Sequence, residues 1–167
     1  MLVTGAAAGI GRATALAFTE AGARVVAVDR DAEGGARTAE TARSLGATPS
    51  AWGEVVDVGD EQAMEEFTER ITAETGVADV LVDNAGIGPA GSFLDMTSEE
   101  RRKVLGVDLW GVIHACRISG ARTAGRGQGD HIVVVASAAA HQPSRALPAS
   151  STSKAAALML GELRTGS

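Results

Sequence analysis

Short apolar segments alternate with longer segments of helical periodicity along the 167 residues of this chain, and this alternation strongly constrains the fold. Strands that are apolar throughout, rather than at every second position, are typical of a parallel sheet that helices cover on both faces. We therefore predict a single α/β domain over residues 1–167, built on a doubly wound parallel sheet. Its strands are expected at residues 2–3, 24–29, 54–58, 78–82 and 131–136.

Helices are predicted between these strands, because apolar residues recur there at every third or fourth position. In the first helix this spacing is shown by Ala13, Ala17, Phe18 and Ala21. The longest helix is expected to begin at residues 97–98, with two glutamates in its first turn, and to reach about residue 123. The remaining helices are expected at residues 31–45, around 64–71 and from about residue 151, and a glycine-rich turn at 125–129.

The composition limits the possible partners and predicts the kind of core. Apolar residues make up 45% of the chain but aromatic residues only 3%, so the core is expected to be aliphatic. The net charge is −6 and the arginines are scattered, which argues against nucleic acid as a partner. No signal peptide or membrane span is predicted, and we expect a cytoplasmic protein without a metal site.

A glycine-rich segment at residues 4–11 follows the first predicted strand and opens the first helix. In this context such a loop binds the pyrophosphate of a dinucleotide. The glycines allow a tight turn and a close approach of phosphate to backbone N–H groups, and the helix N-terminus attracts the anion. The residues expected to contact the cofactor here are Thr4, Gly5, Gly9, Ile10 and Gly11.

Asp29 ends the second predicted strand. In dinucleotide-binding domains, an acid about 20 residues after the glycine motif binds the ribose 2′-hydroxyl of NAD, and Asp29 lies close to that position. The same carboxylate would repel the 2′-phosphate of NADP. Arg30 beside it would partly reverse that preference. We therefore favour NAD as the cofactor and leave NADP open.

Together with the T-G-x-x-x-G-x-G spacing of the loop, several later motifs resemble those of the short-chain dehydrogenases/reductases. Residues 56–58 resemble the strand end that meets the adenine, and residues 83–86 resemble the N-N-A-G turn with Asp in place of the first Asn. The resemblance implies a Rossmann-type sheet of strand order 3-2-1-4-5 and an NAD(P)-dependent oxidoreductase acting on an alcohol or carbonyl. It implies further cofactor contacts from Asp57, Val58, Asn84, Ala85, Gly86 and Lys154.

The resemblance also implies four catalytic positions. In the family a tyrosine exchanges a proton with the substrate oxygen, while a lysine lowers the pKa of the tyrosine and holds the nicotinamide ribose. A serine contacts the substrate oxygen, and an asparagine holds a relay water. Ser137 and Lys154 match this scheme, whereas Ser150 stands at the tyrosine position and Asp108 at the asparagine position.

The chain contains no tyrosine, so no tyrosine elsewhere in this sequence can take over the role expected at position 150. A serine hydroxyl is a far weaker acid than tyrosine, whose ordinary pKa is about 10. We favour Ser150 as a helix N-terminal serine without chemistry, and Asp108 as a residue that has lost its function or become a solvated helix residue. His141 is a candidate substitute acid, although we favour an ordinary loop histidine. Two functions stay open: an oxidoreductase of impaired activity, or an inactive NAD-binding domain.

Members of the resembled family continue beyond the helix that carries Lys154, with further strands and a substrate-binding segment. We therefore expect a dinucleotide-binding domain that is shortened at both ends relative to the family and lacks its C-terminal strands. The fifth strand would then be an exposed edge, which favours pairing with another chain. A homo-oligomer is expected through the helices at 97–123 and 151–165, the usual family dimer face.

Overall fold

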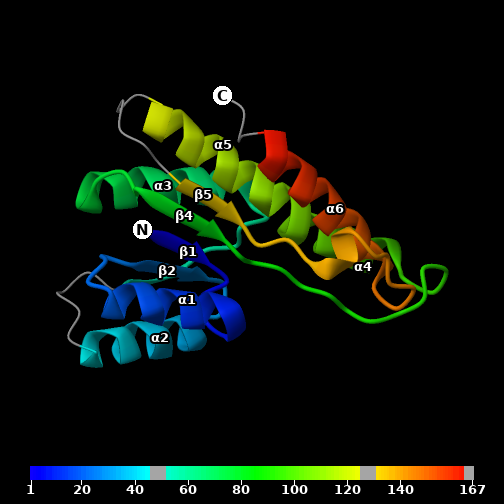
Figure 1. The fold of residues 1–167 in the computed structure, drawn as a ribbon, viewed down its shortest axis with the longest axis horizontal. Coiled ribbons are helices and arrows are strands. Elements are labelled where there is room, and N and C mark those ends of the chain that lie inside the picture. The colour runs from blue at the N-terminus through cyan, green and yellow to red at the C-terminus, as the bar shows by residue number, and fades with distance from the viewer. Residues whose placement is uncertain (46–51, 125–130, 164–167) are drawn as a thin grey trace.

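The computed structural model describes residues 1–45, 52–124 and 131–163, in which strands and helices alternate from the first strand to the last (Figure 1). The strands are β1 (Leu2–Thr4), β2 (Val26–Asp29), β3 (Trp52–Val55), β4 (Val80–Asp83) and β5 (His131–Val134). The helices are α1 (Gly9–Glu20), α2 (Ala32–Ser44), α3 (Glu61–Thr75), α4 (Ser98–Leu105), α5 (Gly111–Ala124) and α6 (Pro148–Leu163), with a π-helical turn η1 (Gly106–Trp110) and a 3₁₀ turn η2 (Ala138–Ala140).

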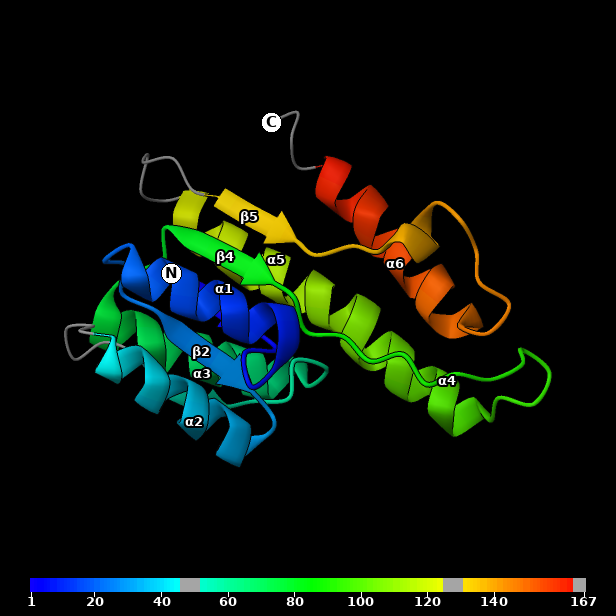
Figure 2. The ribbon, with the colours of Figure 1, turned by 60° about the horizontal axis from the view of Figure 1, so that its bottom comes forward.

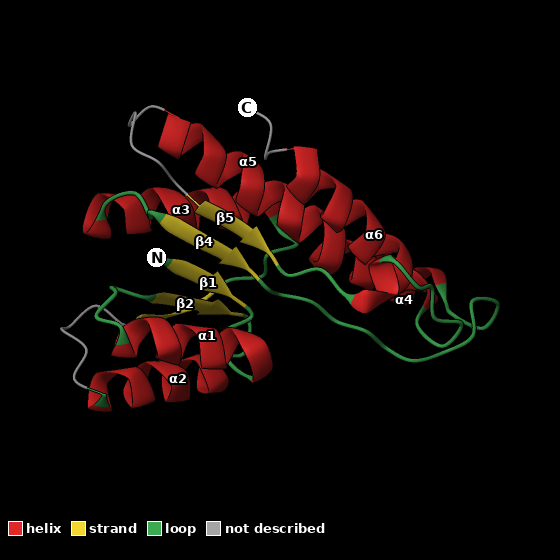
Figure 3. Cartoon of the chain, viewed as in Figure 1, coloured by secondary structure: helices red, strands yellow, loops and turns green. Residues whose placement is uncertain are grey.

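The five strands form one parallel sheet of order β3-β2-β1-β4-β5, which confirms the predicted Rossmann-type topology. Figure 3 shows β2, β1, β4 and β5 side by side in this order. The central strand β1 is short, and its Leu2 pairs with Val26 of β2 on one side and with Leu81 of β4 on the other. All strands run the same way, so their carboxyl ends meet at one edge. Ligands of open parallel sheets bind at that edge.

Helices cover both faces of the sheet. The helices α1 and α2 lie side by side on one face, and α3 and α5 cover the other (Figures 1 and 2). Successive strand residues point to opposite faces, so Leu2 joins the core under α3 and α5 whereas Val3 joins the core under α1. A smaller cluster joins Val112 and Cys116 of α5 to Ala157 of α6. No helix in the described ranges is both long and apolar enough to cross a membrane.

The third strand differs from its prediction. It was expected at residues 54–58, but it spans Trp52–Val55, because its ladder with β2 ends where Asp29 pairs with Val55. The N–H of Val56 still donates to the carbonyl of Asp29, and the chain then leaves the sheet. The side chains of Val56 and Val58 are buried in the main core, so their apolar pattern reflects burial after the strand rather than pairing within it.

The first helix also buries a different face from the one that its apolar residues mark. The buried side is formed by Gly11, Ala15 and Thr19, whereas Phe18 is 37% exposed. A Cβ at Gly11 would lie 2.2 Å from the carbonyl oxygen of Gly5. The helix therefore turns its smallest side chains towards the glycine loop and the sheet. The need for the helix to pack closely against the loop decides which face is buried, rather than the hydrophobicity of its side chains.

The long helix expected at 97–123 is interrupted by the π-helical turn η1, in which Asp108 is buried. It begins with a capping box: Thr97 accepts from the backbone of Glu100, and the Glu100 side chain accepts from the backbone of Thr97. The last helix begins at Pro148, earlier than the expected residue 151. Proline at a helix start needs no N–H partner. The predicted turn at 125–129 and the end of the 31–45 helix at Gly46 lie outside the described residues.

We expect Met64→Ala to destabilise the chain by about 2–5 kcal/mol, because Met64 is 2% exposed in the core under α3 and its loss leaves a cavity. Chemical denaturation followed by circular dichroism measures this change. The control is Leu94→Ala, at a position 87% exposed in the loop before α4, which should alter stability by less than about 0.5 kcal/mol. Equal effects of the two variants would contradict the described core.

Candidate functional site

The glycine-rich loop at the carboxyl end of β1 has the backbone that its sequence predicts. Gly5 and Gly9 have positive φ angles of 65° and 54°, a region that side chains with a Cβ rarely adopt. Ala8 is the N-cap of α1 and offers no side-chain cap, and no acidic residue lies in the first turn. The N–H groups of that turn therefore form a ready binding site for an anion.

A hydroxyl on β1 ties the loop to the end of β4. The Thr4 hydroxyl donates to Oδ1 of Asp83 over 2.8 Å and accepts from the backbone N–H groups of Asn84 and Ala85, both at 3.0 Å. The Asn84 side chain in turn donates to the carbonyls of Thr4 and Gly5. These bonds fix the turn after β4 directly against the glycine loop.

Asp29 lies where the sequence predicts a ribose-binding acid, and it also supports the loop. One carboxylate oxygen accepts from the N–H of Ala7 over 2.9 Å, and the other accepts from the N–H of Asp31 over 3.0 Å. A carboxylate has about four acceptor sites, so both oxygens can still accept from a ribose hydroxyl.

A pocket of about 90 Å³ opens beside Asp29 at the carboxyl edge of the sheet. It brings together residues from five separate segments: the glycine loop, the end of β2, the segment after β3, the turn after β4 and the π-helical turn η1. Seven predicted cofactor contacts line it: Gly5, Asp29, Arg30, Asp57, Val58, Ala85 and Gly86. Thr4, Gly9, Ile10, Gly11 and Asn84 belong to the adjoining loop and turn and do not line the pocket itself.

Lys154 of α6 reaches the turn after β4 from the other side. Its ammonium group donates to the carbonyl of Val135 over 2.9 Å, and the residue is only 8% exposed. A Cβ at Gly86 would lie 3.3 Å from Lys154 Nζ and 3.5 Å from Asp108 Oδ1, so both side chains approach the backbone of this turn closely. Lys154 therefore lies next to the predicted cofactor turn, as the resemblance implies.

Asp108 is not the solvated helix residue that one interpretation allowed, since it is 1% exposed. Its Oδ1 accepts from the N–H of Ile87 over 2.7 Å, and its Oδ2 faces the hydroxyls of Ser150 at 3.5 Å and Ser153 at 3.4 Å. Burial raises the pKa of Asp108 above its ordinary value, against the opposing effects of the Ile87 N–H and the charge of Lys154.

Asp83 is a second buried acid close to this cluster. Burial raises the pKa of Asp83, while the hydrogen bond from Thr4 and the charge of Lys154 oppose that rise. Its Oδ2 has no hydrogen-bond partner among the described residues. An unpaired buried carboxylate oxygen is costly in its charged form, which is why burial dominates here.

Ser137 and His141 occupy the segment that follows β5. Ser137 is exposed and caps η2, where its hydroxyl accepts from the N–H of Ala139 over 3.1 Å. His141 is exposed at the end of the same turn. Since η2 packs against α6, Ser137 is held near the helix that carries Lys154, but no bond joins it to Ser150 or Lys154.

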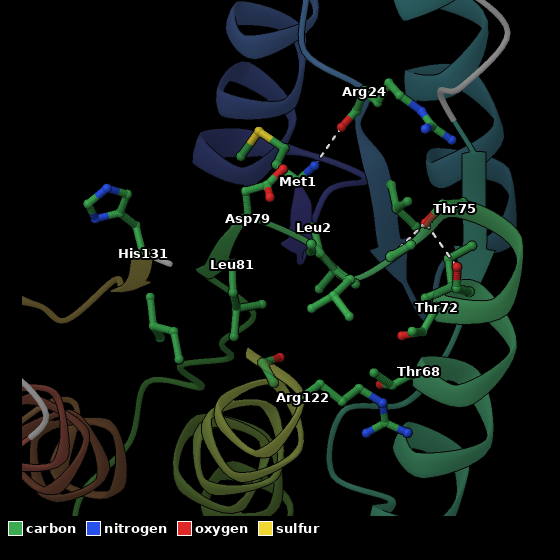
Figure 4. A pocket seen from close by; sticks show the side chains of 17 residues that line it. Met1, Leu2, Arg24, Thr68, Thr72, Thr75, Asp79, Leu81, Arg122 and His131 are labelled. Carbon is green, nitrogen blue, oxygen red and sulfur yellow. Dashed lines mark hydrogen bonds between the residues drawn. The ribbon is translucent and has the colours of Figure 1, made fainter. Parts of the chain in front are cut away.

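A second pocket, of about 100 Å³, lies at the amino ends of the strands (Figure 4). Met1, Arg24, Thr75, Asp79 and Arg122 are among its lining residues. No predicted cofactor or catalytic residue borders it. The glycine loop and the open helix N-terminus lie at the opposite edge of the sheet, so we place the candidate site there.

Three supporting side chains were not predicted. Thr38 of α2 donates to the carbonyl of Ala6 over 2.9 Å, and His114 of α5 bonds through Nδ1 to the carbonyl of Val58 at 3.1 Å. Neither contact has a local sequence signal, because each joins segments distant in the chain. Ser153 lies three residues after Ser150, a spacing that places two residues on one helix face and could have revealed it.

Comparison with known proteins gives matches along almost the whole chain. A family model described as short chain dehydrogenase matches residues 1–163. The probable oxidoreductase EphD of Mycobacterium tuberculosis is 48% identical over 161 residues, which cover 96% of this chain and 27% of that protein. The 2,3-dihydro-2,3-dihydroxybenzoate dehydrogenase of Bacillus subtilis is 36% identical over 157 residues, covering 94% of this chain and 59% of that enzyme.

Among solved structures, a short chain dehydrogenase/reductase from Burkholderia phymatum in complex with NAD superposes with a TM-score of 0.93 at 29% identity. The match covers 98% of this chain and 57% of that one. This chain thus spans between about a quarter and three-fifths of the length of these three relatives.

We expect Asp83→Asn to flatten the pH dependence of stability. Because the folded pKa of Asp83 is raised, its stabilising contribution is complete below the ordinary carboxyl pKa and is lost as pH rises through the folded pKa. Asparagine stays neutral, so the variant should be more stable than the wild type at pH 7, by roughly 1 kcal/mol. Urea denaturation between pH 4 and 8 measures the slope.

Part of the slope should remain in that variant, since the pKa of Asp108 is raised as well. The control is Asp95→Asn, at an exposed loop position, which should keep the wild-type slope. A wild-type slope in Asp83→Asn would mean that Asp83 is not a buried charge.

Proposed function

Because this chain belongs to the short-chain dehydrogenase/reductase family, we propose that it binds NAD at the carboxyl edge of its sheet and transfers hydride between the nicotinamide and an alcohol or carbonyl substrate. The observation that carries the proposal is the 90 Å³ pocket, which seven predicted cofactor contacts line. The open N-terminus of α1 beside it suits a pyrophosphate. Lys154, next to Gly86, would hold the nicotinamide ribose.

NAD is the proposed cofactor rather than NADP. Asp29 lines the pocket with its carboxylate held in place by the N–H groups of Ala7 and Asp31. A fixed negative charge at that position favours a ribose hydroxyl and disfavours a phosphate. Arg30 lines the same pocket, and its positive charge would attract the 2′-phosphate of NADP, so NADP is the second choice.

The proposed activity is impaired, and a catalytically inactive NAD-binding domain is the second candidate. The chain has no tyrosine, and Ser150-x-x-x-Lys154 resembles the family's Tyr-x-x-x-Lys segment with serine in place of the general acid. Losing a general acid/base typically lowers a rate by about 10²–10⁴-fold. The alternative rests on the serine at position 150 and on Asp108 in place of asparagine, and it leaves the cofactor pocket intact.

We expect calorimetric titration to show tighter binding of NADH than of NADPH. Asp29→Asn keeps an acceptor for the Ala7 N–H but removes the charge, so it should shift the preference towards NADPH by roughly tenfold, equivalent to about 1.4 kcal/mol. The matched control is Asp31→Asn, which retains an effective N-cap for α2 and should keep the wild-type preference. Failure of the wild type to bind either nucleotide would refute the proposed site.

We expect Ser150→Tyr to raise NAD-linked alcohol oxidation by about 10²-fold or more, because it restores a phenolic acid beside Lys154. Absorbance at 340 nm with a set of secondary alcohols follows the reaction. Ser150→Phe is the control, since it adds the ring without the hydroxyl and should give no gain. If the tyrosine variant binds NADH but stays at the control level, the impairment does not lie at position 150.

The chain is also proposed to form a homo-oligomer through the helices at 97–123 and 151–163. Exposed apolar side chains lie on both segments: Trp110 on η1, and Met159 and Leu163 on α6. Light scattering after size-exclusion chromatography should give twice the mass of the chain. Met159→Glu should yield a monomer, whereas Phe93→Glu, at an exposed position in the loop before α4, should not; a monomeric wild type would contradict the proposal.

A further inference from the structure

A closed cluster of polar groups lies behind Ser150. Asp108, Ser153 and Lys154 are buried, whereas Ser150 is half-buried and is the most exposed member of the cluster. Its hydroxyl lies 3.7 Å from where a Cβ at Gly88 would stand, beneath the segment that continues from the predicted cofactor turn. A bound molecule that contacts the Ser150 hydroxyl would therefore be linked to the buried Asp108 carboxyl group through a hydrogen bond.

We propose that Ser150 is a catalytic residue in this chain and that Asp108 acts through it, so that the pair Ser150 Oγ–Asp108 Oδ2 performs the proton transfer that the absent tyrosine would perform. This inference rests on the proposed function, since it assigns the acid and base of the proposed reaction. It gives the substitution at position 108 a role that an asparagine cannot fill, because an amide does not take up a proton near neutral pH.

The hydrogen-bond arrangement gives each oxygen of Asp108 a separate task. Oδ1 is held by the Ile87 N–H over 2.7 Å, which fixes the orientation of the carboxyl group. Oδ2 accepts from Ser150 over 3.5 Å, and this bond leaves the lone pairs of the Ser150 oxygen free to accept another proton. Contacts of this kind are often long without substrate and shorten when it binds.

Proton balance follows from this arrangement. In alcohol oxidation the substrate O–H proton passes to Ser150 Oγ while the proton of the Ser150 hydroxyl passes to Asp108 Oδ2, so Ser150 ends neutral and Asp108 protonated. The oxidised nicotinamide, when bound, accepts the hydride from the substrate carbon. In carbonyl reduction both protons move back, and Asp108 must begin in its protonated form.

The charged surroundings suit a carboxyl group that changes protonation. The positive charge of Lys154, on α6, opposes the rise in the pKa of Asp108. The same charge opposes the rise in the pKa of Asp83, at the end of β4. Burial raises the pKa of Asp108, which brings it closer to neutral pH, where a group can both release and accept a proton. Oxidation should therefore rise, and reduction should fall, as pH increases through the Asp108 titration.

The test compares the wild type with Asp108→Asn, Ser150→Ala and Thr152→Ala. Carbon-13 NMR of the carboxyl groups, with Asp108 assigned by its absence in Asp108→Asn, gives its titration midpoint without turnover. Rates of NAD-linked oxidation of cyclohexanol and 2-butanol are measured over the same pH range, and NADH affinity is measured by calorimetry for every variant.

We expect the Asp108 midpoint above the ordinary value of about 3.9 and the wild-type rate to follow that titration. Asp108→Asn and Ser150→Ala should each lower the rate by about 10²-fold or more with NADH affinity unchanged, and Asp108→Glu should restore part of it. Thr152→Ala removes an exposed hydroxyl on the same helix that bonds the Pro148 carbonyl, and it should match the wild type.

Three results would overturn the inference. The first is an Asp108→Asn variant as fast as the wild type or faster, and the second is a rate that does not follow the Asp108 titration. The third is turnover by Ser150→Tyr but not by the wild type, which would leave the proposed function standing. If no variant oxidises an alcohol although all bind NADH, the proposed hydride transfer fails and this inference fails with it; if none binds NADH, the cofactor site itself is refuted.

Discussion

The hydroxyl of Thr4 is the contact on which the candidate site depends. It donates to one oxygen of the buried Asp83 and accepts from two backbone N–H groups of the turn after β4, so the ends of β1 and β4 meet at one atom. The Asn84 side chain completes the junction by bonding the carbonyls of Thr4 and Gly5. The glycine loop and the 83–86 turn are thereby placed as a unit, and the pocket lies between that unit and the end of β2.

The two halves of the site follow different physical rules. The cofactor half is built from backbone groups and glycines, whose requirement is closeness of approach, as the contacts around Gly5, Gly11 and Gly86 illustrate. The reaction half contains buried ionisable groups, and the charge of each group shifts the pKa of its neighbours. A change at Ser150 or Asp108 would therefore leave the backbone contacts of the cofactor half in place.

Sequence reasoning predicts local features best. The glycine loop, the order of elements and the acid at the end of β2 follow from short motifs, and the structure places them as expected. It fails where a side chain is governed by partners distant in the chain: the end of β3 is set by its ladder with β2, and the buried face of α1 by the carbonyl of Gly5. The burial of Asp108 likewise depends on a π-helical turn and on α6, neither of which a motif reveals.

The central claim is that a dinucleotide binds at the carboxyl edge of the sheet and not at the pocket of Figure 4. The most direct test is an NMR titration of the nitrogen-15-labelled chain with NADH, read residue by residue. The account predicts saturable shifts at Gly9, Gly11, Arg30 and Gly86, with Thr75 and Asp79 unaffected. Shifts confined to the region of Thr75 and Asp79, or none that saturate, would contradict it.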